Sequence, residues 1–210
     1  MSKVQEMVVL ANSYKEGGLC LAGKDLTTKK WIRPVSNSNG GSLSKLAYSN
    51  ITPLNIVSMD LSQHVPLVEQ PENFLISDSK TYIQGNFPRL ALENLIDTPS
   101  NLWMYGSKKD RVTPQEILSN QAIHQSLYLI KVEKLKIIVE SNFCGGTKLV
   151  GEFHYNDVSY RLSITDLSYC HYKNNPIGFF KIETNQYLCL SLGAFFAPTG
   201  HHYKLIAAIL

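Results

Sequence analysis

The apolar residues of this chain fall in short runs that are rich in β-branched and aromatic side chains. Runs of this kind favour β-strands over long helices. Turn-forming Gly, Asn, Asp and Pro residues separate many of them. We therefore expect a mainly β protein, with strands near residues 4–11, 19–26, 31–35, 56–61, 127–132, 135–139, 149–155, 158–164, 187–192 and 203–210.

Helix signals are confined to the middle of the chain. A short apolar stripe that includes Leu92 and Leu95 lies between Pro88 and Pro99. The sequence TPQE at 113–116 combines a capping threonine, a proline at the first helical position and a glutamate that completes a capping box. It predicts a helix that runs to about residue 122 and turns residues 117 and 118 inward.

The chain thus divides into two β-rich parts around this middle segment. We expect one domain at residues 1–100, a helical or irregular connection at 101–125 and a second domain at 126–210. Within the second part, Asn156-Asp157 between two alternating runs predicts a β-hairpin. The layout leaves open two small barrels or one split sandwich.

Composition excludes several classes of protein. The chain has 210 residues, of which 44% are hydrophobic and 18% charged, so it can bury a core and is not disordered throughout. A net charge of +3 excludes a histone-like polycation but allows a local basic groove. Tight nonspecific binding to duplexes is also disfavoured, because it depends on neutralising many phosphates.

The cysteines indicate a reducing compartment. Cys20, Cys144, Cys170 and Cys189 form no C-x-x-C pair, so we expect four reduced thiols and no metal site. The sequence shows no signal peptide and no apolar run of about 20 residues that would span a bilayer. We expect a cytoplasmic protein without a membrane partner.

Common catalytic and cofactor motifs are missing from the sequence. It contains no P-loop, no dinucleotide-binding glycine pattern, no H-E-x-x-H and no nucleophile elbow. We therefore expect no cofactor and assign no catalytic residue.

Three parts of the sequence, taken together, resemble a known family. They are GLCLAG at 18–23 followed by WIRPVS at 31–36, LSITD at 162–166, and YLCLSLG at 187–193 followed by HYKLIAAI at 202–209. In this order they resemble the bacterial family of dual OB-domain-containing proteins over nearly the whole chain. The resemblance implies a mainly β fold of two packed OB-like small barrels with a few short helices. It also implies a nucleic-acid-binding or nucleotide-sensing role.

Aromatic residues beside basic ones supply the candidate binding residues of the first barrel. OB folds bind single strands through aromatic rings that stack on bases and through Lys and Arg that track phosphates. Tyr14 is followed by Lys15, and Trp31 and Arg33 are two positions apart, which places them on one face of a strand. We expect these four residues to share a ligand-facing surface. The alternative is that the aromatic side chains fill the core.

The second barrel offers a matching polar set. Asp166 would accept a hydrogen bond from a base edge or ribose, while His202 and Lys204 would contact the ligand beside it. The plainer interpretation is that Asp166 caps the turn that follows it and that the histidines belong to a solvated loop.

The function predicted from the sequence is binding of single-stranded nucleic acid or of a small nucleotide. An enzyme that acts on a nucleotide or nucleic acid is an alternative, with Asp166, His171 or His202 beside Lys204. A protein-binding adaptor is another, because OB folds host several functions.

Overall fold

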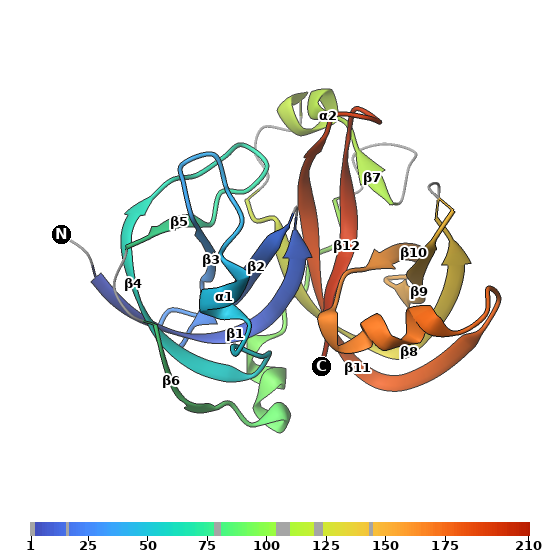
Figure 1. Cartoon of the computed structure of the whole chain (residues 1–210), viewed down its shortest axis with the longest axis horizontal. Coiled ribbons are helices and arrows are strands. Elements are labelled where there is room, and N and C mark those ends of the chain that lie inside the picture. Colours follow the sequence, from blue (N-terminus) through green and yellow to red (C-terminus); the bar gives the residue numbers. More distant parts are fainter. Residues whose placement is uncertain (1–2, 16, 78–80, 104–109, 120–123, 143–144) are drawn as a thin grey trace.

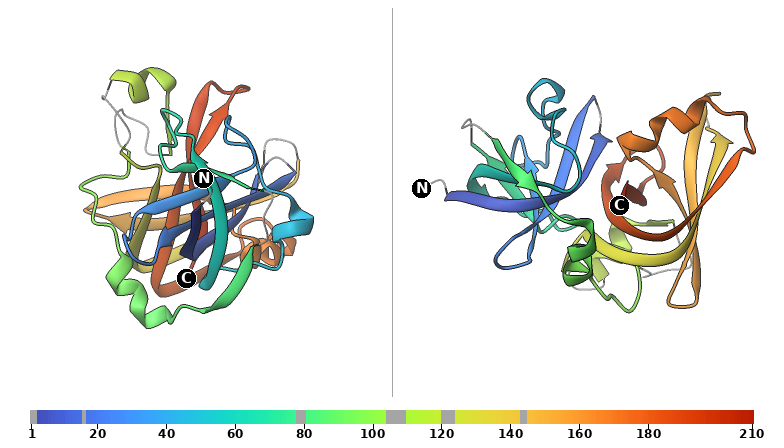
Figure 2. Two further views of the ribbon diagram at one scale, coloured as in Figure 1. Left: turned by 90° about the vertical axis from the view of Figure 1, so that its left-hand side faces the viewer. Right: turned by 90° about the horizontal axis from the view of Figure 1, so that it is seen from below.

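The computed structural model describes residues 3–15, 17–77, 81–103, 110–119, 124–142 and 145–210. Its strands form two closed five-stranded barrels that lie side by side (Figure 1). The prediction of a mainly β protein with two small barrels is therefore confirmed. Seen from below, each barrel encloses its own interior (the right-hand view of Figure 2).

The first barrel is built from the N-terminal strands. They are β1 (Lys3–Lys15), β2 (Gly18–Asp25), β3 (Trp31–Val35), β4 (Asn55–His64) and β5 (Asn73–Ile76). They pair in the order β1-β2-β3-β5-β4, and a β1–β4 pairing closes the ring. The short helix α1 (Lys45–Tyr48) lies between β3 and β4 in the chain, and β6 (Tyr82–Asn86) adds to β4.

The second barrel repeats this topology. Its strands are β8 (Leu127–Ser141), β9 (Thr147–Tyr155), β10 (Val158–Ile164), β11 (Phe180–Phe196) and β12 (His201–Ile209). They pair in the order β8-β9-β10-β12-β11, with β8–β11 closing the ring, and η2 (Leu167–Asn174) lies between the third and fourth strands. In both barrels the third and fifth strands are parallel and the other neighbours are antiparallel. This is the connectivity of a five-stranded Greek-key OB barrel.

The β9–β10 hairpin forms where the sequence predicted it. Asn156 and Asp157 have φ angles of 47° and 61°. Two positive φ values in a two-residue loop match the twist of the flanking strands, so an Asn-Asp pair serves here although it lacks the preferred glycine.

The segment between the barrels holds η1 (Arg89–Leu95), β7 (Arg111–Val112) and α2 (Pro114–Ser119). The predicted capping box is present, because Glu116 Oε2 accepts from Thr113 N at 2.7 Å and Glu116 N donates to Thr113 Oγ1 at 3.2 Å. Ile117 is buried, but Leu118 is 67% exposed, so the prediction that both turn inward was wrong for Leu118. A six-residue helix has fewer than two turns and presents one narrow apolar face.

β7 belongs to the second sheet, since it pairs with β12. This two-residue strand lies within the segment assigned to the connection and extends the second sheet beyond β12. The last predicted residues of the α2 helix, 120–122, lie outside the described residues.

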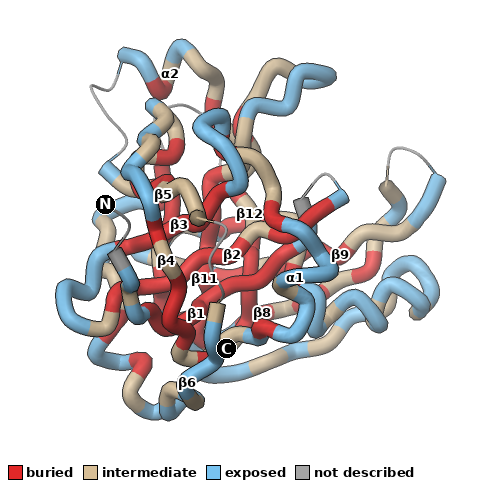
Figure 3. Tube along the Cα trace, turned by 60° about the vertical axis from the view of Figure 1, so that its left-hand side comes forward, coloured by how far each residue is buried: buried red, intermediate tan, exposed pale blue. Residues whose placement is uncertain are grey.

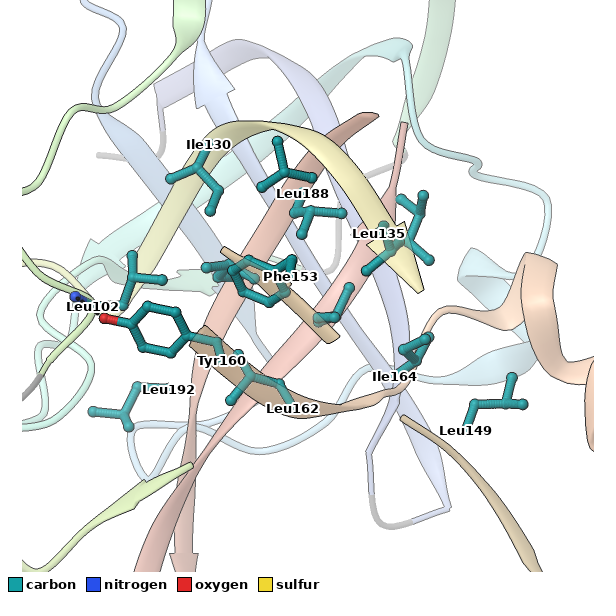
Figure 4. Packing of buried hydrophobic residues seen from close by; sticks show 14 of the residues in the cluster. Leu102, Ile130, Leu135, Leu149, Phe153, Tyr160, Leu162, Ile164, Leu188 and Leu192 are labelled. Atoms are coloured by element: carbon teal, nitrogen blue, oxygen red, sulfur yellow. Dashed lines mark hydrogen bonds between the residues drawn. The ribbon is translucent and has the colours of Figure 1, made fainter. Parts of the chain in front are cut away.

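Each barrel has an apolar interior of its own. In the second barrel Phe153 stacks on Tyr160 with their ring centroids 5.5 Å apart, among leucine and isoleucine side chains from the surrounding strands (Figure 4). The hydroxyl of Tyr160 accepts from the backbone N–H of Leu102 at 3.4 Å, which ties the connecting segment to this core.

A third apolar core lies between the barrels. It joins side chains from β1, β2 and β3 to side chains from η1, β8, β11 and β12. The buried parts of these strands run through the middle of the molecule, whereas α1 and most loops lie outside (Figure 3). The second barrel therefore covers part of the outer face of the first, at β1, β2 and β3.

Candidate functional site

The inter-barrel cavity opens at the junction of the two barrels and has a volume of about 370 Å³. The first barrel contributes residues of β1, β2 and β3, and the second contributes β10, β11 and β12. Its lining residues are Ser13, Tyr14, Cys20, Arg33, Gln70, Ser163, Thr165, Ser191, Gly193, Ala194, Phe195, Phe196, Tyr203, Leu205 and Ala207.

Aromatic side chains from both barrels line this cavity. Tyr14 is 50% exposed, and Phe195 and Phe196 are 48% and 49% exposed. Tyr203 joins them from β12, with its ring centroid 6.2 Å from that of Phe196. Half-exposed aromatic rings around a cavity offer flat faces on which a planar ligand can stack.

Buried polar side chains also line the inter-barrel cavity. The guanidinium of Arg33 donates to Ser126 Oγ at 2.7 Å, to Ser191 Oγ at 3.2 Å and to Cys20 Sγ at 3.3 Å. Its charge is balanced by Glu72, whose carboxylate oxygen lies 3.7 Å away. Arg33 is thus an ion-paired group held by both barrels, and it adds hydrogen-bonding capacity to the cavity.

The basic cavity, of about 260 Å³, adjoins the first one and shares Ser163 and Tyr203 with it. Its other lining residues are Asp110, Arg111, Glu140, Lys148, Val150, Arg161 and Lys204. The lining therefore carries four cationic side chains against two carboxylates. A flat ligand in the inter-barrel cavity would have positive charge beside it.

The predicted residues of the first barrel are only partly brought together. Tyr14 and Arg33 line the same cavity. Trp31 does not join them: it is 6% exposed, packs in the core between the barrels and donates from Nε1 to Asp97 Oδ2 at 3.0 Å. Trp31 thus lacks the open face that stacking requires, because the second barrel covers this side of β3. The side chain of Lys15 lies outside the described residues.

The predicted residues of the second barrel are also separated. Asp166 is buried and both its oxygens are occupied, by Ser168 N and by Ile209 N, each at 2.8 Å. It caps the turn into η2, and burial raises the pKa of its carboxyl. His202 is buried, with Nδ1 3.1 Å from the carbonyl oxygen of Gly193. Only Lys204 lines one of the two cavities.

No acid–base arrangement forms from the residues named for the enzymatic alternative. Asp166 and His202 are engaged as described, and His171 lies on η2 with its ring against Tyr172. Among the described residues there is also no group of three or more His, Cys, Asp or Glu side chains that could hold a metal ion. Cys20, Cys170 and Cys189 are free thiols, while Cys144 lies outside the described residues.

Sequence reasoning missed the phenylalanines of the inter-barrel cavity. Phe195 and Phe196 are adjacent at the end of β11, which is irregular between Leu192 and Phe195. Neighbouring residues of a strand point to opposite faces, so at least one of two adjacent phenylalanines points away from the barrel interior. That pair, at a strand end, was the available signal.

The sequence matches the family model of the dual OB-containing domain over residues 5–209. The chain belongs to this family. No curated protein matches it in sequence. The described part of the chain contains no helix long and apolar enough to cross a membrane.

Several solved structures align over most of this dual OB chain at low similarity. The crystal structure of the p204 HINb domain is 10% identical, with a TM-score of 0.36, and covers 99% of this chain and 93% of its own. A murine DNA-binding protein bound to double-stranded DNA is 10% identical, with a TM-score of 0.37, and the alignment covers 99% of this chain and 93% of that protein. A replication protein A heterotrimer bound to single-stranded DNA is 10% identical, with a TM-score of 0.38, and the alignment covers 100% of this chain and 48% of that one.

Proposed function

We propose that this dual OB protein binds single-stranded nucleic acid, or a nucleotide, in the inter-barrel cavity. The observation that carries the proposal is the set of half-exposed aromatic side chains, Tyr14, Phe195 and Phe196, around one cavity that adjoins a basic one. Its family supports the same class of ligand, because OB barrels commonly bind oligonucleotides.

An unpaired base fits this cavity better than a duplex does. Stacking on Tyr14 or Phe196 requires an open base face, which a paired and stacked base lacks. The net charge of +3 is also too small for binding driven by many phosphate contacts. The basic cavity would instead give a local contact for the phosphate next to the stacked base.

Fluorescence anisotropy with a labelled single-stranded oligonucleotide tests this proposal. Phe196→Ala should weaken binding roughly tenfold or more, since stacking contributes about 1–3 kcal/mol per base. Phe180→Ala is the matched control, because Phe180 is 56% exposed on the same strand but lines neither cavity. Equal losses in both variants, or none in Phe196→Ala, would contradict the proposed site.

The salt dependence of the same titration separates stacking from charge. The loss in Phe196→Ala should persist as salt rises, because stacking is not mainly a charge effect. Arg161→Met removes a half-exposed cation of the basic cavity and should reduce the salt slope. A competing duplex of the same sequence should displace the labelled strand poorly.

A further inference from the structure

Lys204 is an unusual member of the basic cavity. Its side chain is 1% exposed, and its ammonium has no hydrogen-bond partner among the described residues. A buried cation without a partner costs free energy that the rest of the fold must offset. Such a group is expected where a ligand of opposite charge completes the arrangement.

Each of the other cations of the basic cavity lies against a carboxylate. Arg111 pairs with Asp110 at 2.8 Å. Arg161 pairs with Glu140 and Glu152, and Lys148 lies 3.7 Å from Glu140. Among the described residues, Lys204 is therefore the one cation of this lining without an ion pair within 4.0 Å, and it is also the most deeply buried.

We propose that the basic cavity binds a terminal phosphate monoester, so that the protein recognises a phosphorylated end of a single strand or a free mononucleotide. The inference rests on the proposed function, because the base next to this phosphate would lie in the adjoining inter-barrel cavity. Ser163 and Tyr203 line both cavities and would lie between base and phosphate.

Burial of Lys204 favours a terminal phosphate over an internal one. A group must enter a cavity of about 260 Å³ to reach the ammonium. An internal phosphodiester carries a sugar on each side and a single negative charge. A terminal monoester carries a second charge near neutral pH and keeps three oxygens free to accept hydrogen bonds. A terminal monoester can thus reach the buried ammonium more easily than an internal phosphodiester, and it brings more negative charge to it.

Binding of oligonucleotides that differ only at one end tests the inference. The probes are one oligothymidine with a 5′-phosphate, a 3′-phosphate or neither, labelled at the opposite end. One phosphorylated form should bind about tenfold more tightly than the unphosphorylated one, as expected for hydrogen bonds to a charged group. Thymidine monophosphate, compared with thymidine, tests the free nucleotide in the same way.

Lys204→Met should abolish this advantage, so that the variant binds the phosphorylated and unphosphorylated strands with equal affinity. Lys131→Met is the matched control, since Lys131 is an exposed lysine paired with Glu93 outside both cavities. The control variant should keep the full advantage. Circular dichroism and a thermal melt would verify that both variants fold.

The outcomes separate the two proposals. If phosphorylated and unphosphorylated strands bind equally, or if Lys204→Met keeps the preference, the phosphate site is overturned while the proposed function stands. If no strand binds, the proposed function fails, and phosphorus NMR with inorganic phosphate then decides on the basic cavity alone. Binding that Lys204→Met removes would support an anion site there, and absence of binding would overturn it.

Discussion

At the scale of single residues, the two candidate residues of β3 have different surroundings. Tyr14 and Arg33 were expected on one surface and do line one cavity. Trp31, two positions from Arg33, does not line the cavity, because it packs in the core between the barrels. The sequence of β3 alone does not reveal that its outer face packs on a second barrel. Alternation along a strand assigns a residue to a face, but packing of domains decides whether that face meets solvent.

Arg33 illustrates the consequence for mutagenesis. The sequence alone suggested that Arg33→Ala would weaken ligand binding without unfolding the protein. In the structure Arg33 is 2% exposed and balances the buried Glu72. We now predict that Arg33→Ala lowers the free energy of unfolding by about 3–5 kcal/mol, because it leaves a buried carboxylate unpaired.

Urea unfolding of a double variant checks this explanation. Arg33→Met with Glu72→Gln removes both charges and should recover most of the lost stability. A loss in the double variant as large as in Arg33→Ala would show that packing, rather than the unpaired charge, causes the effect.

Lys204 gives a prediction for the pH dependence of stability. Burial lowers the pKa of Lys204 from 10.5 to about 8, although Asp110 and Glu116 act in the opposite direction. Below pH 8 Lys204 is protonated in both the folded and the unfolded state. The folded state then bears the whole cost of burying the ammonium, about 3 kcal/mol. Between pH 8 and 10.5 the folded protein releases this proton first, and the cost declines.

Lys204→Met should therefore be more stable than the parent protein at pH 7, and the difference should shrink as pH rises from 8 to 10.5. Chemical unfolding at several pH values, with Lys131→Met as the control, measures it. A difference that grows with pH over this range would mean that the ammonium is stabilised in the folded state.

At the scale of elements, local signals predicted what local interactions determine. The capping box at 113–116 and the hairpin at 156–157 both formed, because each depends on residues a few positions apart. Leu92 and Leu95 are buried as the apolar stripe indicated, in η1. The pairing of β7 with β12 is a long-range contact, and no pattern in the two residues of β7 could predict it.

The β9–β10 turn offers a stabilising substitution. Asp157 has a φ of 61°, a conformation that glycine adopts without a steric penalty. Asp157→Gly should therefore raise the free energy of unfolding by several tenths of a kcal/mol to about 1 kcal/mol, as in favoured Asn-Gly turns. Thermal melts measure the change, and Asp157→Ala is the comparison. A glycine variant no more stable than the alanine variant would argue against this turn geometry.

At the scale of the whole molecule, two barrels of one topology share a buried interface. Asp97 shows the linkage well: it accepts from Lys24 Nζ at 2.7 Å, from Trp31 Nε1 at 3.0 Å and from the Leu129 backbone N–H at 2.8 Å. One carboxylate thus joins both barrels to the segment between them. The family resemblance implied two OB-like barrels, and their shared topology does not require shared residues.

The interface predicts that the barrels unfold together. Leu129→Ala, at a fully buried position of the inter-barrel core, should cost about 2–5 kcal/mol. Calorimetry should still record one transition, shifted to lower temperature. Leu46→Ala is the control, since Leu46 is 96% exposed. Two separate transitions in the parent protein would contradict a cooperative interface.

The central claim is that unpaired bases bind in the cavity between the barrels. Photocrosslinking a 4-thiothymidine oligonucleotide to the protein, followed by mass spectrometry, tests it most directly. The account predicts crosslinks in the tryptic peptide 182–204, which carries Phe195, Phe196 and Tyr203, and their loss in Phe196→Ala but not in Phe180→Ala. Crosslinks confined to surfaces outside both cavities, and unchanged by Phe196→Ala, would contradict it.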